Sequence, residues 1–116
     1  MFDNITGAAM SAKRLSQAHD IPRSKSREVV ARAAGYRDWH HLTRIVGTPN
    51  APVCDVASLR NGRWPRPMTD YLIAHPAIGG IDAWELAELI IPDPVLPRAI
   101  ADPLLAVARD ELKLQQ

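Results

Sequence analysis

Residues 24–42 read SKSREVVARAAGYRDWHHL and hold two helix patterns joined by a short turn. In the first pattern, Val29 and Val30 lie on an apolar stripe that leads to Gly35, which suits the left-handed position at the end of a helix. Asp38 then suits the N-cap of a second helix. The stretch therefore predicts two short helices that pack closely against each other.

The aromatic residues of this stretch have a structural explanation. Tyr36 is expected to close over the turn, and Trp39 to enter the core between the helices, with Leu42 on the same helix face. Replacing Trp39 by alanine should then cost about 3 to 5 kcal/mol. We interpret five residues as structural: Gly35, Tyr36, Asp38, Trp39 and Leu42.

A further helix is expected before this pair. Its N-cap is Asp3 or Asn4, and its helical pattern ends near Ala18. The apolar stripe of this helix contains Ile5, Ala8, Ala12 and Leu15. Pro22 fits the first turn of the middle helix, with Ser24 as an alternative cap. The first part of the chain therefore predicts a tri-helical unit.

A connector rich in proline and glycine, residues 47–67, follows this unit. Four prolines and an Asn-Gly turn dipeptide prevent a long element there. A short helix over about 52–60 would place Val53, Val56 and Leu59 together. A short strand is the alternative.

Prolines also divide the rest of the chain into short helices. Three helices are expected, over residues 67–74, 82–91 and 103–113. Tyr71, Leu72 and Ile73 supply the apolar contacts of the first. The second begins with Asp82 and Glu85, which form an aspartate version of the capping box.

The absence of a strong strand pattern and the length of the chain predict one all-α domain over residues 1–116. It would consist of a compact N-terminal tri-helical unit, residues 1–46, followed by the connector and a proline-segmented set of short helices in residues 68–116. Because only 5% of the residues are aromatic, the core of this domain must consist mainly of small and aliphatic side chains.

The charges are distributed unevenly along the chain. Residues 1–68 carry 11 basic and 5 acidic side chains, whereas residues 69–116 carry 3 and 8. The first part therefore has a net charge of +6 and the second a net charge of −5. A basic surface for nucleic acid and mutual attraction between the two parts both explain this asymmetry.

The quoted stretch resembles a small helical module of bacterial glyoxalase-related proteins. In that module a helix is followed by Gly-Tyr, a basic residue and Asp-Trp, which correspond here to Gly35, Tyr36, Arg37, Asp38 and Trp39. The resemblance implies a helical fold for residues 24–42. It implies no activity, since glyoxalase-like activity in that family would belong to a separate β-rich domain. The sequence departs from the family at Pro22, where a Ser cap is usual, and at Arg27, where an apolar residue is usual.

Residue types that catalyse reactions or bind metals do not converge in this sequence. The four histidines are His19, His40, His41 and His75. None has a cysteine or acidic partner at a recognised ligand spacing, and the neighbours His40 and His41 diverge by about 100° on a helix. Gly79 and Gly80 lack the flanking residues of a phosphate-binding loop. We therefore predict no catalytic, cofactor-binding or metal site, no small-molecule substrate, and a protein that is not an enzyme.

The cysteine content and the length of the apolar runs indicate in which cellular compartment the protein is expected. The single cysteine, Cys54, excludes an internal disulfide and fits a reducing compartment. No apolar run approaches about 20 residues, and the N-terminus lacks a basic-then-apolar signal pattern. We expect a cytoplasmic protein without a membrane partner.

Two binding functions follow from these observations. The favoured one is a regulatory, adaptor or inhibitor protein that binds another protein or complex through its acidic region. The acidic candidates are Asp70, Glu85, Glu88 and Asp93. Acidic and basic surfaces that are exposed to solvent would complement the charges of a partner protein. A function of this kind needs no catalytic residues.

The alternative is nucleic-acid binding by a helix-turn-helix-like pair, because two helices joined by a Gly-containing turn lie in a basic segment. The candidate contacts are Arg23, Lys25, Arg27, Arg37, His40, His41 and Arg44. The apolar positions of the second helix come one residue later than is usual in that motif. Cations that form one unpaired stripe would favour nucleic acid, whereas cations that pair with the acidic candidates would favour a protein partner.

Overall fold

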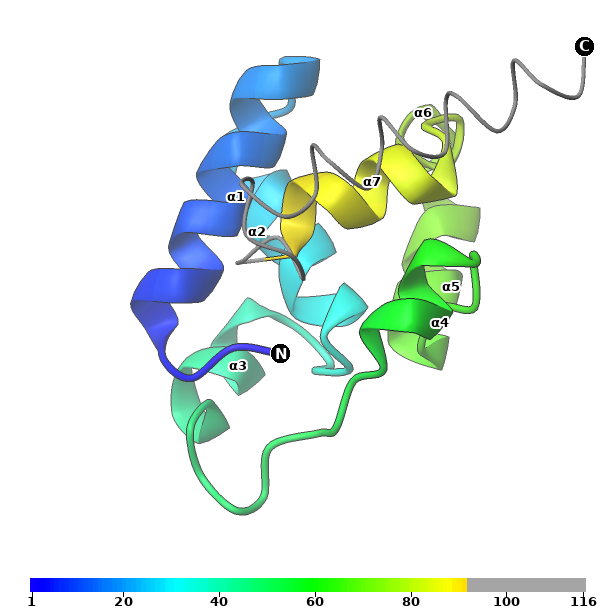
Figure 1. Ribbon diagram of the computed structural model, residues 1–116. Helices are drawn as coiled ribbons and strands as arrows, with labels where there is room; N and C mark the ends of the chain where they lie inside the picture. Colours follow the sequence, from blue (N-terminus) through cyan, green and yellow to red (C-terminus); the bar gives the residue numbers. More distant parts are fainter. Residues whose placement is uncertain (92–116) are drawn as a thin grey trace, which may run out of the picture.

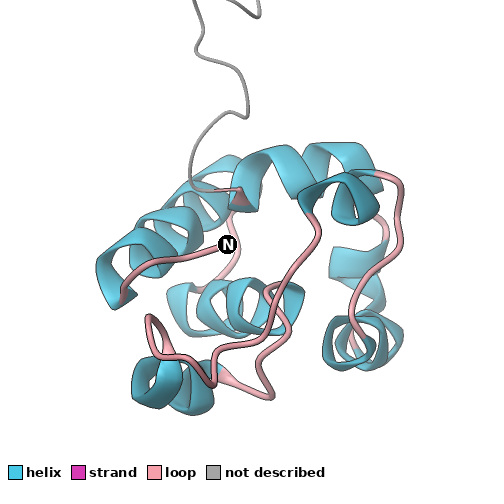
Figure 2. Ribbon diagram, turned by 60° about the horizontal axis from the view of Figure 1, so that its bottom comes forward, coloured by secondary structure: helices cyan, strands magenta, loops and turns pink. Residues whose placement is uncertain are grey.

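The computed structural model describes residues 1–91, which form seven helices and no strand (Figures 1 and 2). The helices are α1 Ile5–His19, α2 Arg23–Ala33, α3 Trp39–Ile45, α4 Val56–Arg60, α5 Arg66–Ala74, α6 Pro76–Gly79 and α7 Ala83–Ile90. The predicted all-α class is confirmed. The helix expected over 103–113 lies outside the described residues.

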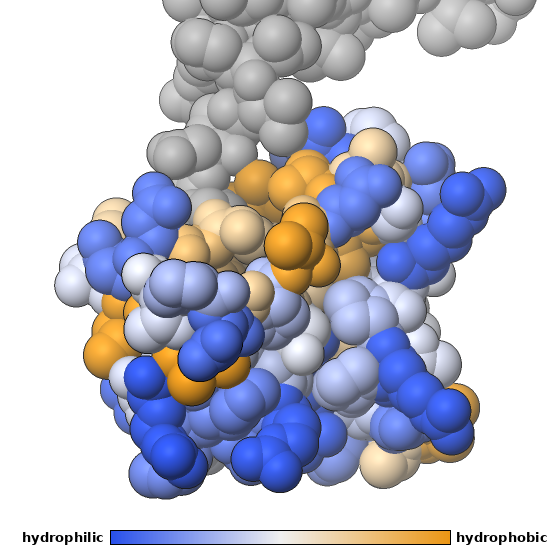
Figure 3. Space-filling view, turned by 90° about the horizontal axis from the view of Figure 1, so that it is seen from below, coloured by the Kyte–Doolittle hydropathy of each residue, from blue (hydrophilic) through white to orange (hydrophobic). Residues whose placement is uncertain are grey.

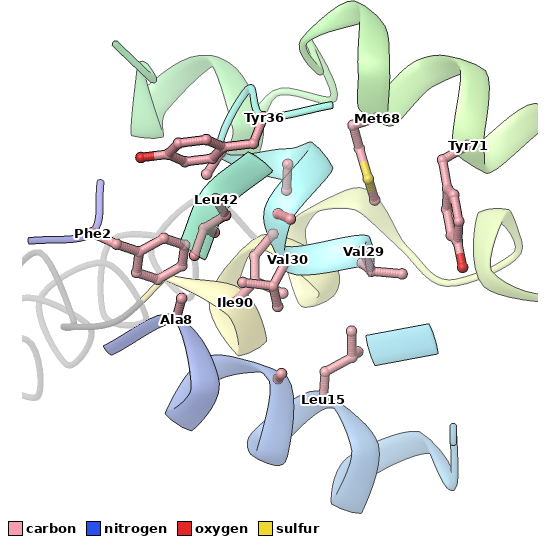
Figure 4. Packing of buried hydrophobic residues seen from close by; sticks show 14 of the residues in the cluster. Phe2, Ala8, Leu15, Val29, Val30, Tyr36, Leu42, Met68, Tyr71 and Ile90 are labelled. Atoms are coloured by element: carbon pink, nitrogen blue, oxygen red, sulfur yellow. The ribbon is translucent and has the colours of Figure 1, made fainter. Parts of the chain in front are cut away.

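The α2 helix occupies the centre of the fold. It packs against α1, α3 and α5, while α7 crosses from α1 to α4 (Figure 1). Figure 4 shows Val30 of α2 beside Ile90 of α7, with Leu15 of α1 and Leu42 of α3 in the same core. These four side chains are fully buried. The core is therefore mainly aliphatic, as the composition requires.

The first helix begins where its N-cap predicts. The side chain of Asn4 accepts a hydrogen bond from the backbone N–H of Gly7 at 3.0 Å. Ala8, Ala12 and Leu15 are buried as expected. Ile5 was wrongly expected beside them, since 43% of its surface is exposed. The preceding Phe2 covers this end of the core instead, close to Ala8 in Figure 4.

The turn between α2 and α3 has the hydrogen bonds of a Schellman motif. The N–H of Gly35 donates to the carbonyl of Arg32 at 3.1 Å, and the N–H of Tyr36 donates to that of Ala31 at 3.0 Å. Gly35 has a φ of 95°, so the predicted left-handed glycine is confirmed. Tyr36 is buried, and Asp38 caps α3 through the backbone N–H of His41 at 2.7 Å.

Trp39 was wrongly expected in the centre of the core. It is half-buried and packs at the edge of the main cluster. As the first residue of α3 it lies over the outer side of α2, where the Arg27 guanidinium stands 5.6 Å from its ring centre. Because part of its surface already contacts water, truncation of Trp39 should cost less than truncation of a fully buried tryptophan.

Within residues 47–91 the structure has a helix at each of the three predicted places, and one helix, α6, that was not predicted. The α4 helix is the predicted short helix rather than the alternative strand, and α7 begins at Asp82, whose side chain accepts from the N–H groups of Trp84 and Glu85. Pro76 ends α5 and also begins the unpredicted α6. Val53 and Ile73 were wrongly expected to pack, since they are 100% and 74% exposed.

Arg14 joins α1 to the end of α7. Its Nη2 donates to the carbonyl oxygen of Ile91 at 2.6 Å and to Oγ of Ser11 at 3.2 Å. Arg14→Ala should lower the free energy of unfolding by about 1.5 to 3 kcal/mol, because a buried carbonyl would lose its charged donor. Urea denaturation measures this loss. The exposed neighbour Lys13 provides the control: an equal loss in Lys13→Ala would show that charge alone is responsible.

Candidate nucleic-acid interface

Six cationic or titratable side chains lie on α2, α3 and the turn between them. We call this set the basic surface: Arg23, Lys25, Arg27, Arg37, His40 and Arg44. All six residues are exposed. Figure 3, a view from below Figure 1, shows hydrophilic residues over much of this face, with several separate hydrophobic areas between them.

The basic surface has no ion pair within the part of the chain that the structure describes. The three ion pairs among residues 1–91 are His19–Glu85, Arg32–Glu28 and Arg60–Glu88. Each of them uses a cation outside the basic surface. The exposed Arg and Lys groups of α2, the turn and α3 therefore keep their charge available to a ligand.

Helix geometry and one aromatic contact connect these side chains. Arg23 and Arg27 lie four residues apart on one side of α2, and His40 and Arg44 do the same on α3. Arg27 bridges the two helices, because its guanidinium lies over the ring of Trp39. This contact places Arg27 beside the start of α3, whereas Lys25 lies on another side of α2 and lines a separate hollow.

His41, which was predicted from the sequence as a candidate nucleic-acid contact, does not lie with the exposed cations. It is half-buried, and its Nδ1 accepts a hydrogen bond from the backbone N–H of Arg37 at 3.1 Å. Its ring also meets the ring of Tyr36 edge-on, with 5.7 Å between the centres. His41 therefore holds the turn in place, because it lies on the side of α3 that faces Tyr36.

Two carboxylates close the N-terminal end of α3. Oε1 of Glu28 accepts from the backbone N–H of Trp39 at 3.2 Å, and the Asp38 side chain accepts from that of His41. The hydrogen bond from His41 holds the pKa of the Asp38 carboxyl below its usual value. The backbone N–H groups of Trp39 and His41 are therefore engaged at this end of α3.

The acidic candidates do not form one unpaired surface. Oε1 of Glu85 lies 3.1 Å from Nε2 of His19, and Oε1 of Glu88 lies 2.8 Å from Nη2 of Arg60. Asp70 is exposed on α5, and Asp93 lies outside the described residues. Glu85 and Glu88 are exposed to solvent, and each also forms an ion pair that connects α7 to another helix.

One exposed aromatic residue was not singled out from the sequence. Trp84 on α7 is 55% exposed, and the Arg60 guanidinium lies 5.4 Å from its ring centre. A hollow of about 310 Å³ beside it is lined by Val56, Ala57, Arg60, Asn61 and Trp84. The available signal was the helical register, since Trp84 lies on the opposite side of α7 from the buried Leu86.

Residues 1–91 contain no group of three or more His, Cys, Asp or Glu side chains arranged to hold a metal ion. Within the same residues, no helix has the length and apolar character needed to cross a membrane. Cys54 is half-buried, and its Sγ donates to the carbonyl of Ala33 at 3.4 Å. Burial raises the pKa of this thiol, which disfavours the reactive thiolate.

The geometry of the basic surface is therefore the main guide to function. It combines exposed cations from two helices and their turn with a half-buried tryptophan. Comparisons of the chain with family models, with curated proteins and with solved structures found no match.

Proposed function

We propose that the protein binds nucleic acid through the basic surface. The observation that carries this proposal is the distribution of ion pairs. Glu85 and Glu88 form ion pairs with His19 and Arg60, whereas no side chain of the basic surface forms an ion pair among residues 1–91. Mutual neutralisation therefore does not account for these cations in the described part of the chain. Clustered Arg and Lys side chains with this exposure suit a polyphosphate ligand.

Binding to a nucleic acid should depend steeply on salt. We expect micromolar binding of a fluorescent random duplex DNA at low salt, measured by anisotropy, and weaker binding as salt rises. The double variant Arg37→Ala, Arg44→Ala removes two cations of the basic surface. It should make the slope of log K against log salt shallower by about 1.8, since each neutralised duplex phosphate contributes about 0.9.

A matched variant controls for net charge. Arg63→Ala, Arg66→Ala also removes two exposed cations, but from the α4–α5 connection and α5 rather than from α2 and α3. This control should retain the original slope. Absence of binding to duplex DNA and to single-stranded RNA at low salt would overturn the proposal, as would equal slopes in the two double variants.

A protein partner is the second candidate function, and Trp84 favours it. Trp and Arg dominate the binding energy of many protein interfaces, and here Arg60 lies over the exposed ring of Trp84 beside an open hollow. A regulatory or adaptor protein would use this face of α4 and α7. The expected result is one partner that the original protein captures and that Trp84→Ala loses, while nucleic-acid binding is retained.

A further inference from the structure

The geometry points to a surface that contacts the phosphodiester backbone and does not read base edges. This inference rests on the proposed nucleic-acid binding and specifies which part of the ligand is recognised. It depends on three features: the end of α3, the size of α3 with its turn, and the distribution of the cations.

The N-terminal end of α3, which a helix-turn-helix protein would direct at the bases, is occupied by two acidic side chains of the protein itself. In such proteins the N-terminal residues of the second helix contact base edges in the major groove. Here the carboxylates of Glu28 and Asp38 accept hydrogen bonds from the backbone N–H groups of Trp39 and His41. The backbone N–H groups of Trp39 and His41 are therefore not free to contact a base edge or a phosphate.

The α3 helix also presents few groups that could read a base. It has seven residues, Trp39–Ile45, and spans about 10 Å at the usual rise per residue. The Thr43 hydroxyl donates to the carbonyl of His40 within the helix. The outward side of α3 is therefore left with two long polar side chains, those of His40 and Arg44.

The turn before α3 places this helix differently from a helix-turn-helix recognition helix. Five residues, 34–38, separate α2 from α3, whereas a turn of 3 or 4 residues is typical of that motif. The buried Tyr36 and the His41–Arg37 hydrogen bond hold the longer turn against the core. In the sequence, the apolar positions of the second helix come one residue later than is usual in a helix-turn-helix motif. The longer turn accounts for this offset.

The cations are spread over three segments rather than collected on one recognition helix. Arg23 and Arg27 project from one side of α2, Arg37 from the turn and Arg44 from α3. Long Arg and Lys side chains on separate elements contact successive phosphates well, and such contacts carry no sequence information. The surface therefore fits a repeating line of phosphates, whatever the bases.

A panel of ligands separates backbone contact from base reading. Anisotropy would compare duplexes of equal length that contain only A·T pairs, only G·C pairs or a random sequence, with inorganic polyphosphate as a competitor without bases. We expect dissociation constants within about threefold of one another, because a base-reading protein loses about fivefold or more for each wrong pair. Polyphosphate should displace every duplex.

Two matched variants test the same point within the protein. Arg37→Lys, Arg44→Lys keeps both positive charges, whereas Arg37→Gln, Arg44→Gln removes them. Backbone contact predicts nearly unchanged binding for the Lys variant and a loss of about tenfold or more at low salt for the Gln variant. Circular dichroism would verify that both variants fold.

The outcomes distinguish this inference from the proposed function. Selection from a random pool of a duplex that binds more than tenfold tighter than the pool, with the preference lost in Arg44→Ala, would overturn backbone contact and leave nucleic-acid binding intact. Failure of polyphosphate to compete would also overturn it. Absence of binding to every ligand at low salt would overturn both.

Discussion

Gly35→Ala should lower the free energy of unfolding by about 2 to 5 kcal/mol, which would be among the largest effects of any substitution that adds one methyl group. Gly35 has a φ of 95°, where a side chain is strained. A Cβ at this position would also stand 3.0 Å from Cβ of Pro52, which belongs to the segment that follows α3. Urea denaturation at neutral pH measures the loss.

A second substitution separates backbone strain from crowding at this turn. Pro52→Gly removes the atom that the new Cβ would meet. If crowding contributes, Gly35→Ala should cost less in the Pro52→Gly background than in the original protein. A cost below about 1 kcal/mol for Gly35→Ala alone would mean that the turn adopts another conformation.

Leu42→Ala should cost about 2 to 5 kcal/mol and also weaken nucleic-acid binding. Leu42 is the only fully buried side chain of α3, whose seven residues are too few for an independent helix. Removing its contacts should therefore loosen α3 as well as the core. Because His40 and Arg44 depend on α3 for their positions, the binding surface would lose its order.

Hydrogen exchange and anisotropy measure the two effects of Leu42→Ala together. Amide protection should fall most in α3, and the affinity for a random duplex should fall with it. Gln17→Ala is a suitable control, since it removes an exposed side chain from α1, outside the basic surface. Uniform loss of protection over all helices, with unchanged protection in α3 relative to α1, would contradict this account.

The helix ends were predictable because their signals are local. Asn4, Asp38 and Asp82 each accept a hydrogen bond from a backbone N–H two or three residues later. Gly35 likewise ends α2 through bonds to carbonyls within five residues. Such pairs form whichever way the helices pack, so a single stretch of sequence is sufficient to predict them.

Burial was harder to predict, because it depends on which helices meet. Ile73 lies next to apolar neighbours on α5, but Met68 and Tyr71 are the side chains of this helix that are buried. Trp39 begins α3 and packs at the edge of the core, where the Arg27 guanidinium lies over its ring. Burial of any apolar side chain stabilises the fold. Which apolar side chains are buried depends on where the helices cross and contact one another.

The sequence by itself determined the all-α class, the main helix ends and the identity of the clustered cations, because these depend on spacing and residue type over a few turns. The tertiary structure decided which charges are paired. His19 meets Glu85 and Arg60 meets Glu88 across 66 and 28 positions of the chain, and these contacts engage two acidic side chains away from the basic surface. Ion pairs act over a few ångströms in space, so only the packing of α1, α4 and α7 could bring these partners together.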